Sequence, residues 1–224
     1  MKFKSQIITE ASGSVGGATY SHNRGGLYIR ARAIPTNPNS PEQQAVRSIM
    51  ADLTTKWSEL LDAAEREAWD TYALNVPLPD TLGEPRNVGG LGMYVRSNLQ
   101  AIQALGSSAR LDVAPIVFDL GSFTQPSIAV TGLSGIAVTF DVLDSWYVDG
   151  GRMFVSGSRP QNASRNYFKG PYRFTDSIVS PDTSPHTAGA PFSYAVGQRV
   201  FVQLRVRQLD GRISLPIRLT GIVT

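Results

Sequence analysis

The sequence contains no cysteine and only two histidines, His22 and His186. Without cysteine, disulfides, thiolate nucleophiles and every Cys-based zinc or iron–sulfur site are excluded. The two histidines lie far apart in the sequence and lack the spacing of a metal-binding pair. We therefore expect no metal and no cofactor, and we expect a protein that is not an enzyme.

Long hydrophobic runs are also missing from the chain. The longest apolar stretches have about six residues, as in positions 113–118 around Pro115, whereas a membrane-spanning helix needs about 20. Polar residues between positions 5 and 10 interrupt any apolar stretch of signal-peptide length near the N-terminus. We therefore expect neither a membrane anchor nor secretion.

The charges are few and are segregated along the chain. Of 224 residues, 17% are charged and 42% are hydrophobic, which is typical of a globular protein. Residues 1–39 carry a net charge of +4, residues 40–85 carry −6 and the remainder carries +5. A basic N-terminal segment can pair with an acidic block in the same chain or in a neighbouring copy. No dense run of lysine and arginine is present, so we expect no specific nucleic-acid binding.

Residues 1–39 have the pattern of an extended arm. Glycines punctuate the segment, and an Asn23–Gly26 turn precedes a stretch in which apolar and basic or aromatic positions alternate from Leu27 to Ile34. We expect a two-stranded hairpin. Such a ribbon is only marginally stable in water, so we expect it to dock on another surface. The expected interface residues are Tyr20, Arg24, Leu27, Tyr28, Ile29, Arg30 and Arg32.

Residues 40–110 have the patterns of a helical platform. Ser40, Pro41 and Gln43 form a capping-box signature that marks a helix start. The apolar positions that follow have spacings of three and four, which predicts one buried helical face. That predicted stripe consists of Val46, Ile49, Met50, Leu53, Trp57, Leu60 and Leu61. Asp62 and Glu65 repeat the capping signal for a second helix, and apolar spacing within 91–105 predicts a third.

From about residue 111 the hydrophobic period changes to two and turn residues recur every eight to twelve positions, which is typical of a β-sandwich. The expected strands are 127–131, 136–142, 152–157, 172–175, 199–208 and 212–220. Pro216 indicates that the last strand lies at a sheet edge. Through Tyr194 and the alternating Val200, Val202 and Leu204, residues 111–224 resemble immunoglobulin-like and fibronectin type III domains. The predicted fold class is therefore α+β, with an arm (1–39), a helical platform (40–110) and a C-terminal antiparallel sandwich (111–224).

Two further sites come into consideration in the sandwich. Trp146, Tyr147 and Tyr172 fall in loops or at strand ends, where aromatic rings can stack on a sugar. Asp141, Asp144 and Asp149 raise the alternative of a calcium ion between loops, although their spacing is not that of an EF-hand. Packing of these aromatic rings in a core or interface is the favoured interpretation.

A resemblance to a known class of proteins comes from the first third of the chain. Its residues form three groups, and these are Gly16-Gly17-x-x-Tyr20-Ser21-x-Asn23-Arg24-Gly25-Gly26-x-Tyr28-Ile29-Arg30, then Pro35-x-Asn37-Pro38-x-Ser40, then Trp57 with Arg66-x-x-Trp69-x-x-Tyr72. This pattern, which covers about residues 13–73, resembles uncharacterised structural proteins of tailed bacteriophages and prophages. The resemblance implies a virion component and carries no catalytic or binding residues.

These observations together predict a non-enzymatic virion structural protein, made in the host cytoplasm and located in the virion. The expected role is a capsid decoration or minor capsid subunit that docks through its N-terminal arm. The expected partners are other virion proteins, such as major capsid or tail subunits, and copies of the chain itself, without a small-molecule substrate. The alternative function is a carbohydrate-binding or host-attachment module of a phage tail. A hydrolase with an unrecognised carboxylate site is a third, less favoured option.

Overall fold

The computed structural model describes residues 12–23, 26–34, 36–80, 83–132 and 135–224. The chain divides into two compact units, which we call the arm unit (residues 1–41) and the main unit (residues 42–224). The division near residue 40 is close to the expected end of the arm. The helices and the C-terminal sheets lie together in the main unit. The expected domain boundaries near residues 39 and 110 stay predictions.

The arm unit contains an antiparallel sheet in the order β1-β2-β3. Its strands are β1 (Gly13–Val15), β2 (Ala18–Asn23) and β3 (Gly26–Ala31). The sequence predicted the β2–β3 hairpin but not β1, which has only three residues. A tight turn at Gly16 and Gly17 joins β1 to β2, and Gly16 has a φ of +55°, a backbone conformation that glycine adopts without strain.

The helices of the main unit are α1 (Pro41–Glu59), α2 (Ala63–Asn75) and α3 (Gly89–Leu105), followed by the 3₁₀ helix η1 (Ser107–Ala109). The short strands β4 (Leu78–Pro79) and β5 (Pro85–Arg86) pair between α2 and α3. At the start of α2, the Asp62 carboxylate accepts a hydrogen bond from the Glu65 backbone N–H, and the Glu65 carboxylate accepts one from the Asp62 N–H. This reciprocal pair confirms the second predicted capping box.

An aromatic core holds the helices together. Trp69 of α2 packs edge-on against Tyr72 and against Tyr94 of α3, with ring centroids 5.9 and 5.5 Å apart. Helix α1 contributes Leu53, which is fully buried, while Met50 and Leu60 are 42% and 54% exposed. The buried face predicted for α1 was therefore only partly correct. The helix contacts its neighbours through fewer residues than its apolar pattern indicated.

Two antiparallel sheets form the C-terminal half of the main unit. One has the order β10-β7-β6 and the other β12-β11-β8-β9. The first comprises β6 (Ser127–Thr131), β7 (Gly135–Thr139) and β10 (His186–Ala188). The second comprises β8 (Arg152–Gly157), β9 (Arg173–Val179), β11 (Arg199–Arg207) and β12 (Ile217–Ile222). The short helix α4 (Ser145–Val148) lies between β7 and β8 in the chain. All six predicted strands are present with shifted ends in four of them, β12 lies at an edge as Pro216 indicated, and the short β10 was missed.

Side chains from both sheets share one hydrophobic core. The core includes Ile136 and Val138 of one sheet with Val155, Val202 and Leu204 of the other. At one edge the sheets also meet through the backbone, since the N–H of Thr224 donates to the carbonyl of Val130, 3.1 Å away. The described strands therefore confirm a mixed α+β protein in which two sheets pack against each other.

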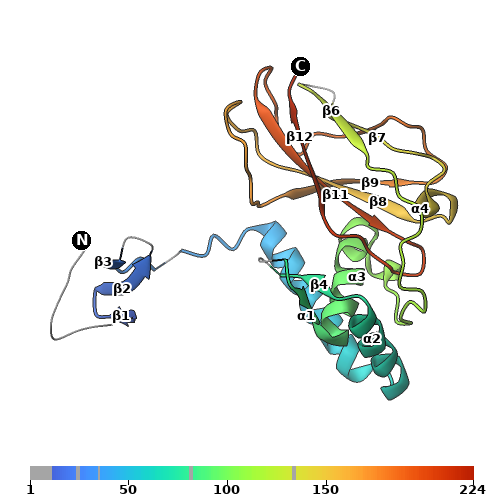
Figure 1. The fold of residues 1–224 in the computed structure, drawn as a ribbon, viewed down its shortest axis with the longest axis horizontal. Coiled ribbons are helices and arrows are strands. Elements are labelled where there is room, and N and C mark those ends of the chain that lie inside the picture. The colour runs from blue at the N-terminus through green and yellow to red at the C-terminus, as the bar shows by residue number, and fades with distance from the viewer. Residues whose placement is uncertain (1–11, 24–25, 35, 81–82, 133–134) are drawn as a thin grey trace. The chain divides into compact units, whose positions relative to one another are not determined.

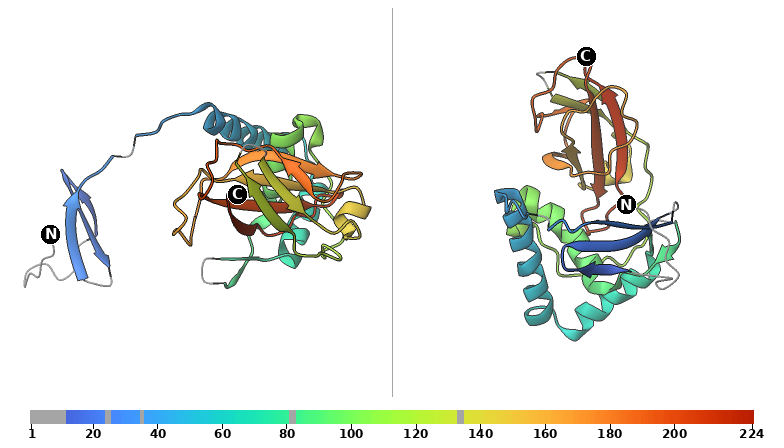
Figure 2. Two further views of the ribbon diagram at one scale, coloured as in Figure 1. Left: turned by 90° about the horizontal axis from the view of Figure 1, so that it is seen from above. Right: turned by 90° about the vertical axis from the view of Figure 1, so that its left-hand side faces the viewer.

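Helix α3 docks on the loop that joins β11 to β12. The Arg96 guanidinium donates to the carbonyl of Ser214, 2.7 Å away, and the Ser97 hydroxyl donates to the carbonyl of Gly211. Figure 1 shows α1, α2 and α3 gathered at one end of the two sheets, and the right-hand view of Figure 2 shows the same arrangement. Among the described residues, no helix combines the length and apolar character required to cross a membrane.

Candidate functional site

The arm sheet has two chemically different faces. Side chains alternate between the faces of a strand, and residues paired across strands share a face. The pairs Val15↔Ala18, Tyr20↔Ile29 and His22↔Leu27 therefore lie on one side of the sheet. The pairs Ser14↔Thr19, Thr19↔Arg30 and Ser21↔Tyr28 lie on the other. We call these the apolar face and the polar face of the arm.

The predicted interface residues are divided between these faces. Tyr20, Leu27 and Ile29 are half-buried on the apolar face, where Val15 is 75% exposed. Tyr28 is half-buried and Arg30 exposed on the polar face, and the exposed Arg32 follows β3. Arg24 lies outside the described residues. The structure thus brings the three apolar candidates together on one face and adds Val15, which the sequence interpretation omitted because β1 was not predicted.

Trp146 is not available as a sugar platform. Its side chain is 1% exposed, and its ring packs between Phe140 and Tyr147 with centroids 5.4 and 5.6 Å away. The indole Nε1 donates to the carboxylate of Asp144, 3.3 Å away. The burial of Trp146 therefore agrees with the packing interpretation and not with the alternative of a sugar platform, because α4 turns the side chain into the core that the two sheets share.

Tyr147 and Tyr172 do not form one site. The Tyr147 hydroxyl donates to the carbonyl of Asp182, 2.6 Å away, which ties α4 to the loop before β10. Tyr172 lies before β9 and donates to the carbonyl of Phe168, 3.1 Å away. The predicted trio is therefore distributed between the core, a structural contact and a separate pocket that contains Tyr172.

That pocket, which we call the aromatic pocket, lies on the outer face of the β12-β11-β8-β9 sheet. It has a volume of about 170 Å³. The lining residues are Asn166, Tyr167, Phe168, Tyr172, Phe201, Arg218, Leu219 and Thr220. Phe168 stacks on Phe201 with centroids 5.6 Å apart and meets Tyr172 edge-on at 5.2 Å, so the aromatic wall is preorganised.

The sequence around residues 166–172 of the aromatic pocket is rich in basic residues. The segment 151–175 contains five basic residues and no acidic residue. Arg218 lies in the pocket wall, and its charge acts on Arg205 of β11. Burial and then the repulsion from Arg218 lower the pKa of Arg205. Among the residues that the structure describes, neither guanidinium has a carboxylate within 4 Å.

The sequence interpretation found Tyr172 but missed the rest of this pocket. Phe201 of the pocket wall occupies an outward position of β11, and Arg218 of the wall lies on the edge strand β12, opposite Gln203 of β11. Arg205, outside the lining, occupies a further outward position of β11. The sequence signal that could have indicated this pocket was a row of aromatic and arginine side chains at the outward positions of a strand whose other face is buried. Asn166 and Tyr167 had no such signal, because their loop meets β11 and β12 only in the tertiary structure.

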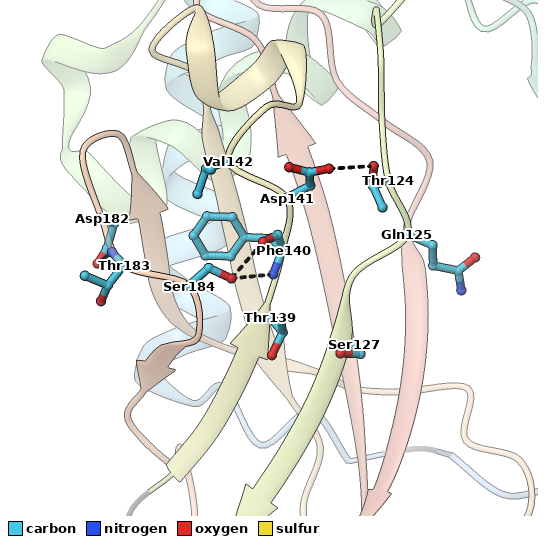
Figure 3. A pocket seen from close by; sticks show the side chains of 10 residues that line it. All are labelled: Thr124, Gln125, Ser127, Thr139, Phe140, Asp141, Val142, Asp182, Thr183 and Ser184. Atoms are coloured by element: carbon cyan, nitrogen blue, oxygen red, sulfur yellow. Dashed lines mark hydrogen bonds between the residues drawn. The ribbon is translucent and has the colours of Figure 1, made fainter.

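A larger, more open pocket lies between the segment before β6, the end of β7 and the loop before β10. It has a volume of about 650 Å³ and is lined by Thr124, Gln125, Ser127, Thr139, Phe140, Asp141, Val142, Asp182, Thr183 and Ser184. Figure 3 shows the Ser184 hydroxyl linked to both the N–H and the carbonyl of Phe140, at 3.0 and 2.7 Å. The Ser184 hydroxyl therefore holds the loop before β10 against the end of β7.

The acidic residues considered for calcium hold loop structure instead. The Asp144 carboxylate is 2% exposed and accepts from the Thr124 N–H, 2.8 Å away, as well as from Trp146. Asp141 accepts from the Leu143 N–H at 2.9 Å. Within the described parts of the chain, no group of three or more His, Cys, Asp and Glu residues is arranged to hold a metal ion. The suggested calcium site therefore has no support in this geometry.

His186 of β10 bridges two carboxylates. Its Nδ1 lies 2.7 Å from the Asp182 carboxylate, and its Nε2 lies 3.2 Å from that of Asp176. Both ring nitrogens therefore face carboxylates, and the contact joins β10 to β9. In comparisons with protein-family models, with curated proteins and with solved structures, nothing matches this chain.

Proposed function

We propose that the protein is a non-enzymatic structural subunit of a bacteriophage virion, which binds neighbouring subunits through the apolar face of its arm. The observation that carries this proposal is the arm sheet itself. It forms a compact unit separate from residues 42–224, and its register gathers apolar side chains on one side. A small sheet gains stability when such a face is covered, so a neighbouring polypeptide is a natural partner.

A second apolar surface in the main unit supports an assembly role. The segment between η1 and β6 exposes several large apolar side chains, including Val113 at 71% and Ile116 at 89%. Phe118 of the same segment is 43% exposed although it also contacts Tyr72 of α2. Exposed apolar patches of this kind mark surfaces that bind other proteins. A subunit with two such surfaces can link two neighbours.

The type of β-sandwich and the position of the subunit in the virion are part of this proposal. We infer that the two packed sheets are an immunoglobulin-like or fibronectin type III-like sandwich, supported by their antiparallel pairing and shared core. The resemblance of residues 13–73 to phage structural proteins favours the virion. A decoration or minor capsid position on the head, with major capsid subunits and further copies as partners, fits a subunit that contributes surfaces rather than chemistry.

The test uses two double variants of the full chain that add the same charge to opposite faces of the arm. Val15→Glu with Leu27→Glu places two carboxylates on the apolar face, whereas Ser14→Glu with Ser21→Glu places two on the polar face. Phage particles from cells that make each variant are fractionated into heads and tails, and the chain is quantified by mass spectrometry.

We expect the wild-type chain in the head fraction, at least a tenfold loss of incorporation for the apolar-face variant and near-normal incorporation for the polar-face variant. Circular dichroism of the purified variants checks that both retain their fold. Equal incorporation of the two folded variants would contradict the role of the apolar face. Absence of the wild-type chain from all particle fractions would contradict the virion assignment.

A further inference from the structure

We propose that the aromatic pocket binds an acidic carbohydrate, with one carboxylate-bearing pyranose ring in the pocket. This inference concerns the outer face of the β12-β11-β8-β9 sheet and is independent of how the arm docks. The occupant is inferred from the size of the pocket, the chemistry of its walls and the uncompensated positive charge beside it.

The volume of the pocket restricts the ligand to a small group. Sites for drug-sized molecules have about 300–1,000 Å³, whereas this pocket has about 170 Å³. That space holds about six water molecules at about 30 Å³ each. A single six-membered ring fills such a space, and the remainder of a longer chain would lie outside it.

The walls offer both an apolar surface and polar groups. The Tyr172 ring is half-buried, and its hydroxyl is already used by the Phe168 carbonyl, so the ring rather than the hydroxyl is presented to a ligand. Tyr167 is 65% exposed at the rim. Asn166 and Thr220 add a carboxamide and a hydroxyl to the lining. An apolar ring face beside hydrogen-bonding groups matches a pyranose, which carries C–H groups on its faces and hydroxyls at its edge.

The charge around the pocket specifies an anion. The Arg218 guanidinium contributes to the wall and has no salt-bridge partner among the described residues. Arg205 lies next to it on the same sheet face, and its Nε is buried without a hydrogen-bond partner in the described structure. A carboxylate can accept two parallel hydrogen bonds from a guanidinium and would offset the repulsion between the two arginines.

An acidic sugar fits these features better than a nucleic acid does. Nucleic-acid affinity comes from many phosphate contacts, whereas one guanidinium lines this pocket. The rings of Phe168 and Phe201 are 8% and 6% exposed and stack on each other, so they are not free to stack on successive bases. The pocket is therefore suited to one carboxylated ring rather than to a strand.

The experiment titrates the ¹⁵N-labelled full chain with D-glucuronate, and in parallel with D-glucose, which has the same ring without the carboxylate. We expect saturable chemical-shift changes at pocket residues with glucuronate and at least tenfold weaker binding of glucose. Arg218→Gln should reduce glucuronate affinity about tenfold and leave the response to glucose unchanged. Arg86→Gln, an exposed arginine on β5, is the matched control and should change neither.

Three results would overturn the proposal. The first is the absence of saturable shifts at the pocket with glucuronate. The second is equal affinity for glucuronate and glucose, because the carboxylate would then play no part. The third is tighter binding of oligothymidylate than of glucuronate at the same residues, which would assign the pocket to nucleic acid. None of these results depends on particle incorporation, so failure here is distinguishable from failure of the proposed function.

Discussion

The side chain of Asn98 on α3 pairs with the backbone of Leu111 through two hydrogen bonds. The Asn98 Nδ2 donates to the Leu111 carbonyl at 2.9 Å, and the Leu111 N–H donates to Asn98 Oδ1 at 2.8 Å. The same Nδ2 also donates to the Tyr94 carbonyl at 3.1 Å. Because Asn98 is fully buried, its side chain takes the place of water as the hydrogen-bond partner of the Leu111 N–H and carbonyl. Leu111 lies in the segment that connects the helices to the sheets.

Replacement of Asn98 by leucine should therefore destabilise the main unit. The substitution keeps the branch point and the number of side-chain heavy atoms but leaves the Leu111 N–H and carbonyl without their partners, and unsatisfied buried groups cost about 1–3 kcal/mol each. We expect Asn98→Leu to lower the free energy of unfolding by about 2–4 kcal/mol, measured by urea denaturation. Gln103→Ala, at an exposed position of the same helix, should change it by less than about 0.5 kcal/mol.

Gly211, in the loop between β11 and β12, should not tolerate a side chain. Its φ of +100° is strained for other residues, and a Cβ there would lie 2.9 Å from Ser97 Oγ and 3.2 Å from Leu111 Cδ1. Gly197→Ala is the matched control, since Gly197 has a φ of +84° with no atom within 4 Å of the added carbon. We expect both variants to lose about 1–3 kcal/mol from backbone strain, and Gly211→Ala to lose more because it also displaces α3. Equal thermal unfolding midpoints would contradict the contact at Gly211.

Leu53 fixes α1 to the other helices. It is the fully buried residue of α1, whereas Met50 of the same helix is 42% exposed. Leu53→Ala should lower the free energy of unfolding by about 2–4 kcal/mol and accelerate amide hydrogen exchange along α1. Met50→Ala should affect both measurements only slightly. Comparable effects of the two variants would mean that α1 packs through a broader face than the structure shows.

The contact of Asp112 with Arg110 should make stability depend on acid pH. The two hydrogen bonds from Arg110, at 2.7 and 2.9 Å, lower the pKa of Asp112, and the Tyr94 hydroxyl at 3.0 Å adds to this. A lowered carboxyl pKa stabilises the folded state at pH values above the unfolded pKa of about 3.9, and this contribution is lost as the pH falls through the folded value. Asp112→Asn should therefore cost about 1 kcal/mol at pH 7 and progressively less below about pH 4. A pH-independent difference in urea denaturation would contradict the assignment.

Trp146 should behave as a core residue. Its indole fills the space next to Phe140 and Tyr147, and removal of a buried tryptophan costs about 3–5 kcal/mol. We expect Trp146→Ala to unfold at a much lower temperature in calorimetry. Tyr167→Ala, at the exposed rim of the aromatic pocket, should change the midpoint little. If Trp146→Ala unfolded at the wild-type midpoint temperature, the burial of Trp146 in the core would be contradicted.

Patterns that depend on neighbouring residues in the chain predicted most of the secondary structure. The Asp62 and Glu65 pair set the start of α2, because a capping box involves residues three positions apart. Strands 127–131 and 152–157 were predicted with their observed ends, since alternation and flanking turns define them locally. The three-residue strands β1 and β10 were missed because three residues are too few to show a period.

Contacts between distant residues decided the rest. In the first turn of α3, the carboxylate of Asp70, on α2, accepts from the Gly90 N–H at 2.7 Å, so a residue 20 positions away satisfies this backbone donor. The burial of Trp146 and the exposure of Met50 depended on which neighbours packed against α4 and α1. The aromatic pocket likewise combines Tyr172 with Phe201 and Arg218 from two other strands. The sequence by itself determined the longer helices and strands and the two faces of the β2–β3 hairpin, because periodicity is a property of the local backbone. Only the tertiary structure decided which side chains are buried and which converge, because those depend on what packs against each face.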